Sequence, residues 1–180
     1  MFLNIITPCT RPFNLESISK SINIPRENYR WIVVFDSLNV PENIPDNCEA
    51  YAVKVNGSVF GNGQRNFALD LVEKGHVYFN DDDTTLHKDL WENIKDFENC
   101  DVISFSQNSK DGSLRLNGNE IVLNKIDSHN IVFKKSIIEN SRWTLGLYNA
   151  DGVFAEECAK KTQNKCYIPK VLSIYNTLRN

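Results

Sequence analysis

The first half of the chain alternates short apolar runs with segments of helical periodicity, and this pattern restricts the fold more than any other feature. The apolar runs predict strands at Phe2–Thr7, Trp31–Phe35, Ala50–Val55 and His76–Phe79. Helical spacing of apolar residues predicts helices over residues 13–22 and 64–74, and from Thr84 or Thr85 to Phe97. Strands that alternate with helices form a mostly parallel sheet covered by helices, so we expect an α/β fold.

The second half has a different pattern, with short strands separated by Asp-Gly and Asn-Gly turn signals. Strands are predicted at Val102–Ser106, Ser113–Leu116, Glu120–Leu123, Ile131–Lys134 and Cys166–Ile174. A short helix ending near Asn140 and a longer one over Asp151–Thr162 complete the chain. The sequence therefore predicts one domain, in which residues 1–100 form a nucleotide-binding half and residues 101–180 a more antiparallel half.

Composition excludes several classes of partner and site. The net charge of −3 does not favour nucleic acid or an anionic membrane as partner. No apolar run reaches the roughly 18 residues that a transmembrane helix needs. The five cysteines are odd in number and lack CxxC spacing, which argues against a zinc site or a disulfide framework. We therefore expect a cytoplasmic protein, in the cytosol of a bacterium or of a virus-infected host.

Three successive carboxylates, Asp81, Asp82 and Asp83, directly follow the fourth predicted strand. Ligands of open α/β sheets bind beyond the carboxyl ends of strands. Neighbouring carboxylates repel one another unless a cation is present, and their hard oxygens suit Mg²⁺ or Mn²⁺. The triplet thus predicts a metal site that can bridge to a diphosphate, with a solvated turn at the start of a helix as the alternative.

Two other segments are expected at the same edge of the sheet. Asp36 ends the second strand, where a carboxylate can accept a hydrogen bond from a base N–H or a ribose hydroxyl, or can serve as a turn residue. The Gly61–Asn66 segment opens a helix, and glycines at a helix start let the backbone approach a phosphate. Arg65 adds a fixed positive charge there, although a plain loop with a surface arginine gives the same sequence.

The second half offers candidates for a general base. Asp151 opens a predicted helix, where it either caps the helix or removes a proton from an acceptor hydroxyl. Glu156 and Glu157 compete for that role from inside the helix. Asp127-Ser128-His129 is a further polar cluster ahead of a strand, in which His129 either binds phosphate or sugar or is a satisfied polar residue.

Four of these segments, in the same order, resemble the GT-A fold of nucleotide-sugar glycosyltransferases, in particular β-1,3-glucuronyltransferases and small family-2-like enzymes of bacteria and large viruses. The residues that carry the resemblance are Ile5–Pro12, Trp31–Asp36, Gly63–Leu69 and Val77–Thr84. The resemblance covers residues 5–98 and fades after about residue 100. It implies a GT-A (Rossmann-like) domain whose residues 1–100 bind the nucleotide sugar and whose residues 101–180 bind the acceptor.

The resemblance also implies roles for individual residues. Those implied to line the nucleotide-sugar site are Thr7, Pro8, Arg11, Asp36, Arg65, Asp81, Asp82 and Asp127. Among them Asp36 would contact uracil, and Asp81 and Asp82 would lie near the ribose and the donor sugar. Asp83, assisted by Asp81, would bind Mn²⁺ or Mg²⁺, and Asp151 would act as catalytic base. The family's phosphate-binding histidine near the C-terminus has no counterpart, since no histidine follows His129.

The resulting hypothesis is a metal-dependent, inverting transfer of a sugar from a UDP-sugar to a hydroxyl of a carbohydrate or glycoconjugate acceptor. Two alternatives stay open. One is a non-catalytic nucleotide-sugar or glycan-binding domain. The other is a metal-dependent phosphohydrolase or nucleotidyltransferase that uses the same acidic triplet.

Overall fold

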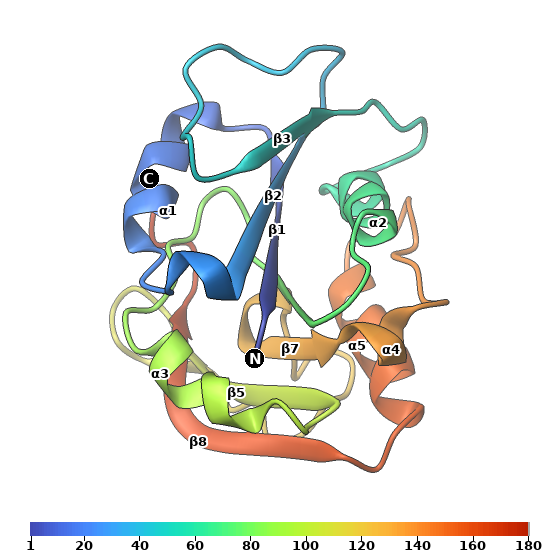
Figure 1. Ribbon diagram of the computed structural model, residues 1–180. Helices are drawn as coiled ribbons and strands as arrows, with labels where there is room; N and C mark the ends of the chain where they lie inside the picture. The colour runs from blue at the N-terminus through green and yellow to red at the C-terminus, as the bar shows by residue number, and fades with distance from the viewer. Residues whose placement is uncertain (180) are drawn as a thin grey trace.

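The computed structural model describes residues 1–179, which form a three-layer α/β/α arrangement around one mixed sheet (Figure 1). The strands are β1 (Leu3–Cys9), β2 (Tyr29–Phe35), β3 (Glu49–Ala52), β4 (His76–Phe79), β5 (Val102–Asn108), β6 (Leu114–Leu116), β7 (Ile131–Lys134) and β8 (Lys165–Ile174). The helices are α1 (Leu15–Ser21), α2 (Asn62–Asp70), α3 (Leu90–Ile94), α4 (Lys135–Ile138) and α5 (Ala150–Lys160). Short 3-10 turns are η1 (Pro12–Asn14), η2 (Arg26–Asn28), η3 (Lys95–Phe97) and η4 (Ser128–Asn130).

The strand order is β3-β2-β1-β4-β7-β5-β6, and β8 pairs with β5. Strands β3, β2, β1 and β4 run parallel, as the alternating pattern predicts, while β7 is antiparallel to both β4 and β5. The predicted α/β class and mostly parallel sheet are confirmed. The sheet continues without interruption from the first half of the chain into the second through the pairing of β4 with β7.

Side chains of the central strands alternate between two apolar cores because successive residues of a strand point to opposite faces. Ile5 and Trp31 face α1 and α3, whereas Ile6 and Ile32 face α2, α4 and α5. In Figure 1, α1 and α3 lie on one side of β1 and β2, and α2, α4 and α5 on the other. Both faces of β1, β2 and β4 are therefore covered, which explains why these strands read as continuous apolar runs.

One predicted strand is wrong, and one predicted helix begins later than expected. No strand forms over Glu120–Leu123; the backbone turns there, and Asn124 has a φ of 67° in the left-handed region. The predicted helix from Thr84 or Thr85 begins only at Leu90. The backbone N–H groups that would start it are bound instead to distant hydroxyls, from Thr85 to Thr177 and from Leu86 to Ser21. The Thr84 carbonyl, which would accept the first helical hydrogen bond, accepts instead from Asn80 Nδ2 at 2.8 Å, so a side-chain contact takes the place of that bond.

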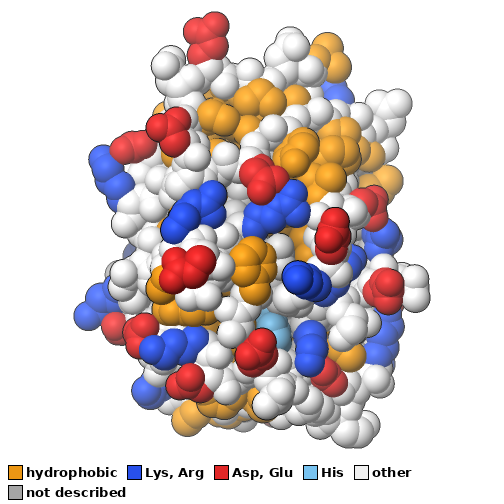
Figure 2. Space-filling view, in the orientation of Figure 1, with side chains coloured by type: hydrophobic (Ala, Val, Ile, Leu, Met, Phe, Trp, Pro, Cys, Tyr) orange, Lys and Arg blue, Asp and Glu red, His pale blue; other side chains and the backbone are white. Residues whose placement is uncertain are grey.

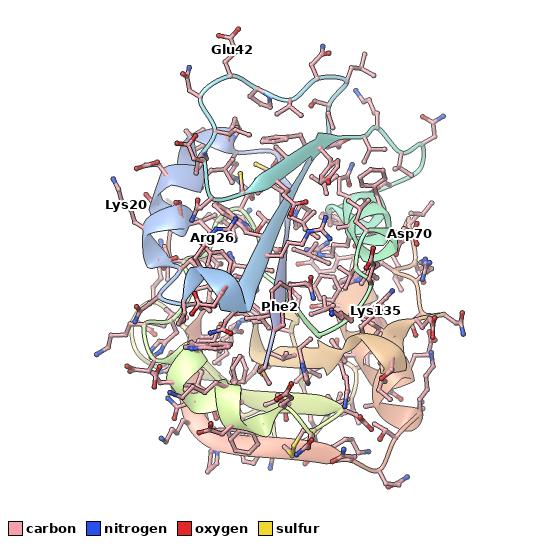
Figure 3. The ribbon with its side chains drawn as sticks, in the orientation of Figure 1. Phe2, Lys20, Arg26, Glu42, Asp70 and Lys135 are labelled. Atoms are coloured by element: carbon pink, nitrogen blue, oxygen red, sulfur yellow. A yellow bond between two sulfur atoms is a disulfide. The ribbon has the colours of Figure 1, made fainter. Side chains whose placement is uncertain are left out.

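The cysteine pattern argues against a disulfide framework, yet one disulfide forms, between Cys100 and Cys166. Cys100 precedes β5 and Cys166 lies in β8, two strands that pair in parallel, so the fold brings together residues 66 positions apart. The bond lies beside β5 and β8 (Figure 3). Such a spacing carries no local signal, which is why the sequence did not reveal it. Of the described cysteines, the other three have free thiols.

The outer layers carry charges of both signs. Figure 2 shows acidic and basic side chains interspersed over the visible face, with no broad area of a single sign. Asp70 at the end of α2 and Lys135 in α4 lie on the same side of the sheet (Figure 3), where Lys135 Nζ donates to the Leu69 carbonyl. Among the described residues, no helix has the length and apolar character that crossing a membrane requires.

Candidate functional site

The ends of β1, β2 and β4 meet at one edge of the sheet because these strands are parallel and neighbours. A cleft of about 640 Å³ opens at this edge. Of the residues singled out from the sequence, its lining includes Pro8, Arg11, Asp36, Arg65, Asp81, Asp82, Asp83, Asp127, His129 and Asp151. The edge of an α/β sheet beyond the carboxyl ends of its strands is where such folds bind ligands.

Asp82 fastens the loop after β1 to the loop after β4. Its Oδ2 accepts the backbone N–H of Thr10 at 2.6 Å and that of Arg11 at 2.7 Å, and its Oδ1 accepts from the Arg11 guanidinium. The Asp82 side chain is buried, so these donors compensate a charge that has lost its water. The structure therefore gives Asp82 a structural task in addition to its position in the cleft.

Asp81 is paired with Arg65, a buried residue of α2. The Arg65 guanidinium also donates to the carbonyl of Phe60 at 2.7 Å and lies 4.5 Å from the ring centre of Trp143. Arg65 thus joins the acidic triplet, the loop before α2 and the residue Trp143 of the second half. It is less available to a ligand than a surface arginine would be.

Asp83 has weaker partners than its two neighbours. Its carboxylate oxygens lie 3.3 Å from Thr84 Oγ1 and 3.4 Å from Arg11 Nη1. Burial raises the pKa of Asp83, and the nearby Asp81 carboxylate raises it further. A carboxylate that is buried and under-compensated gains most from a nearby cation.

The carboxylates of the triplet differ in how readily they could hold a divalent cation. In residues 1–179, no group of three or more His, Cys, Asp or Glu side chains is arranged to hold a metal ion. Mg²⁺ and similar ions are commonly held by one or two carboxylates together with substrate phosphates, so such a group is not required. Asp83 fits that mode of binding, whereas Asp81 would first have to loosen its pairing with Arg65.

His129 connects two carboxylates at the floor of the cleft, a feature the sequence indicated only as a polar cluster. Its Nδ1 lies 2.8 Å from Asp127 Oδ1, and its Nε2 accepts the backbone N–H of Asp81 at 2.9 Å. In this arrangement Nδ1 donates to Asp127, and Nε2 can accept only while the ring is neutral. Protonation of Nε2 would exchange the bond from Asp81 N–H for a contact with the Asp81 carboxylate, 3.6 Å away.

The charges around His129 act on both partners. Burial opposes a charge on His129, but the Asp81 and Asp127 carboxylates outweigh it and raise the pKa of His129 to about 9. Burial likewise opposes ionisation of Asp127, yet its bonds to His129 and its pairing with Arg115 hold its pKa well below the usual range. Asp127 therefore stays ionised and orients the imidazole.

Of the three candidates for the general base, Asp151 is the one that lines the cleft. It lies in the first turn of α5, where burial raises its pKa, and the Asp127 carboxylate adds to that shift. Glu156 accepts the backbone N–H of Leu123 and pairs with Lys160, and Glu157 pairs with Lys161. Neither glutamate is among the lining residues.

The remaining predicted residues differ in exposure. Asp36 is exposed at the end of β2, and its backbone N–H donates to the Cys9 carbonyl at 3.2 Å. Thr7 is fully buried and does not line the cleft; its hydroxyl accepts from the Trp31 indole at 3.0 Å. Thr7 therefore supports the pairing of β1 with β2 beneath the site and does not contact a ligand in the cleft directly.

Several residues of the cleft were not predicted, because no motif in the sequence marks them. They are Phe60, Arg115, Trp143, Tyr148, Tyr175, Asn176 and Arg179. Most belong to loops of the second half or to the C-terminal segment, which the backbone of Leu178 joins to the carbonyl of Asp83 at 2.8 Å. Only the order of the strands in the sheet brings them to the triplet.

Solved structures with a similar architecture place this geometry in a known fold. S. aureus TarS 1-349 matches with a TM-score of 0.75 and 16% sequence identity, covering 97% of this chain and 60% of that one. The same TarS fragment in complex with UDP-GlcNAc gives a TM-score of 0.72 at 14% identity, covering 97% and 58%. This chain has the GT-A fold.

A mannosyltransferase from Pyrobaculum calidifontis, PcManGT in complex with GDP-Man and Mn²⁺, is similar as well, with a TM-score of 0.72 and 16% identity over 99% of this chain and 57% of that one. The chain thus spans somewhat more than half the length of these structures. No protein-family model matches the sequence. No curated protein is similar to it in sequence at a significant level.

Proposed function

We propose that the chain is a glycosyltransferase domain that binds a nucleotide diphosphate sugar, with UDP as the nucleotide, and transfers the sugar to an acceptor hydroxyl. The observation that carries this proposal is the under-compensated, buried Asp83 at the carboxyl edge of a GT-A sheet. Further support comes from the similar structures, of which one holds UDP-GlcNAc and another GDP-Man with Mn²⁺. The four sequence segments that resemble β-1,3-glucuronyltransferases and small family-2-like enzymes lie at the same edge.

In this proposal, Asp83 binds a divalent cation together with the donor diphosphate, and Asp81 is its second candidate ligand. Such a cation, when bound, neutralises charge that develops on the leaving diphosphate. Asp36 is exposed at the end of β2, where its carboxylate can accept from a uracil N–H. Asp82 and Arg11 hold the loops after β1 and β4 together, so that the donor meets a preformed surface.

Asp151 takes the role of general base in the proposed transfer. Its position on the cleft and its raised pKa suit a carboxylate that accepts a proton from an acceptor hydroxyl. The hydroxyl oxygen would attack the anomeric carbon of the donor sugar as the bond to the diphosphate oxygen breaks. A single displacement of this kind inverts the configuration at that carbon. The proton ends on Asp151 and the electron pair on the leaving diphosphate.

Calorimetric titration of UDP with and without Mn²⁺ tests the donor site. We expect Mn²⁺ to strengthen UDP binding in the wild-type protein, and Asp83→Asn to abolish that increase, because the substitution removes one carboxylate charge without changing its volume. Asp96→Asn is the matched control, since Asp96 is exposed on η3 and lies outside the cleft. UDP binding that is unaffected by Mn²⁺, or an Asp83→Asn protein that behaves like wild type, contradicts the proposal.

The products of donor turnover separate the proposed activity from the two alternatives. Release of UDP with a transferred or hydrolysed sugar indicates attack at the anomeric carbon. Release of UMP indicates attack at phosphorus, as in a phosphohydrolase or nucleotidyltransferase. Metal-dependent UDP binding without any turnover across a panel of UDP-sugars indicates a binding domain.

A further inference from the structure

Two aromatic side chains stand exposed at the rim of the cleft. The Phe60 side chain is 62% exposed and that of Tyr148 is 79% exposed, and both line the cleft. Their rings meet edge to face, with centres 5.0 Å apart. Burying a large aromatic side chain stabilises the folded protein or its complex. An exposed aromatic pair on a cleft therefore indicates a contact surface for a ligand.

The two loops that carry this pair are fastened to each other by polar contacts. The backbone N–H of Val59 donates to the Leu145 carbonyl at 3.0 Å. Asn62, a buried residue at the start of α2, donates from Nδ2 to the carbonyls of Thr144 at 2.9 Å and Leu147 at 3.0 Å. These bonds fix the separation of the loops and hence of the two rings.

The backbone at Phe60 is in an uncommon conformation, with a φ of 53° in the left-handed region. Bulky residues rarely adopt it, and such strain persists where neighbouring contacts impose it and often marks a functional position. Here the Phe60 carbonyl accepts from the buried Arg65 guanidinium at 2.7 Å. The following Gly61 has a φ of 78°, and a Cβ there would lie 2.5 Å from Pro8 Cβ. The turn thus keeps the Phe60 ring at the rim.

The aromatic pair shares its cleft with Asp151, the proposed base. Tyr148 lies three residues before Asp151, and both line the same cleft. An acceptor with its hydroxyl at Asp151 would occupy the same cleft that Phe60 and Tyr148 line. A pyranose ring with axial hydrogens on one face presents an apolar C–H surface, which stacks on aromatic rings, while its hydroxyls remain available to polar groups.

We propose that Phe60 and Tyr148 form the acceptor subsite, where they stack on the apolar face of a pyranose ring of a glycan acceptor. This inference rests on the proposed glycosyltransferase function and adds to it the residues that would hold the acceptor sugar. In the proposed function, the donor nucleotide would contact Asp36 and Asp83 and not this pair.

Saturation-transfer difference NMR with methyl β-D-glucopyranoside and methyl β-cellobioside as probes tests the subsite. These sugars carry axial hydrogens at C1, C3 and C5 on one face. We expect the strongest signals from those hydrogens in the wild-type protein, and a roughly tenfold weaker affinity in Tyr148→Ala and in Phe60→Ala, because each loses one stacking surface. Tyr148→Phe keeps the ring and is expected to retain binding.

Phe13→Ala is the matched control, since Phe13 is 78% exposed on η1 and lies outside the cleft. UDP titration of the same proteins separates the two proposals. Unchanged UDP affinity in Tyr148→Ala shows that the variant is folded and that the pair does not hold the uracil. A wild-type protein that binds the sugars but not UDP disproves the proposed function and leaves the sugar subsite standing.

Four results would overturn the acceptor subsite. The first is the absence of any sugar signal in the wild-type protein, and the second is equal sugar binding in wild type and Tyr148→Ala. The third is a parallel loss of UDP affinity in Tyr148→Ala, which would assign the pair to the nucleotide. The fourth is a wild-type dimer in sedimentation that Tyr148→Ala converts to a monomer, which would assign the pair to an interface between copies of the chain.

Discussion

Two regions of the cleft hold carboxylates in opposite ways. Along β1, β4 and β7, the carboxylates are paired: Asp82 with Arg11, Asp81 with Arg65, and Asp127 with His129 and Arg115. At the end of the triplet and in the first turn of α5, Asp83 and Asp151 have raised pKa values because burial is only partly offset by partners. Charges of the first kind stabilise the fold, whereas those of the second kind cost stability and are suited to chemistry.

The largest effect that this comparison predicts is on Asp151. Asp151→Asn is expected to reduce kcat by a factor of roughly 10² to 10⁴, the usual contribution of a general base, and to leave metal-dependent UDP binding intact. It is also expected to raise the melting temperature at neutral pH, because a half-buried charge that has few compensating partners is removed. Rates of UDP release and thermal unfolding measure the two effects.

Glu156→Gln is the control for this substitution, because Glu156 pairs with Lys160 on the same helix outside the cleft. It should retain activity near the wild-type level. If Glu156→Gln rather than Asp151→Asn abolishes turnover, Asp151 is not the base. The raised pKa of Asp151 would then not mark a catalytic group.

A stability change of intermediate size is predicted for Asp82. Asp82→Asn is expected to lower the free energy of unfolding by about 2 kcal/mol, because the amide cannot accept all the hydrogen bonds from Thr10 and Arg11. Urea denaturation measures the change. Asp36→Asn provides the comparison, since Asp36 is exposed at the same edge and its substitution should change stability by less than about 0.5 kcal/mol. Equal losses in the two variants would remove the distinction between paired and unpaired carboxylates.

The smallest predicted effect is a dependence on pH. The base must be ionised, and the pKa of Asp151 lies above the 3.8 of an ordinary aspartate. The value of kcat/KM is therefore expected to fall, as pH decreases, at a higher pH than an unperturbed aspartate would give.

A raised pKa in the folded state favours folding while the group is protonated, and that contribution is lost as pH rises through the folded-state pKa.

The gain in melting temperature of Asp151→Asn over wild type should therefore grow as pH rises through that pKa and disappear in acid. Thermal unfolding over a pH series, run beside the activity profile, measures it. A constant difference at all pH values would show that the Asp151 carboxylate is not the source of the effect.

Sequence and structure agree best for the central strands, whose burial on both faces leaves a local pattern in the chain. Strands β1, β2 and β4 are buried on both faces, so their apolar runs predict them well, and the polar residues after each run fall at one edge. The strand predicted over residues 120–123 does not form, because these residues belong to a turn whose partner, Glu156, is distant in sequence. Likewise, nothing local marks Cys100 and Cys166 as a pair, since only the pairing of β5 with β8 brings them together.

The sequence by itself determined the α/β class and the sheet edge that carries the acidic triplet, because apolar periodicity and strand ends are local properties of the chain. The tertiary structure decided which carboxylates are already neutralised, since Arg11, Arg65 and His129 reach them from three different elements. It also decided that Phe60 and Tyr148 meet at the rim, through bonds between loops that lie far apart in the chain. Charge compensation and the approach of distant loops depend on distances in space, which no spacing of residues along the chain contains.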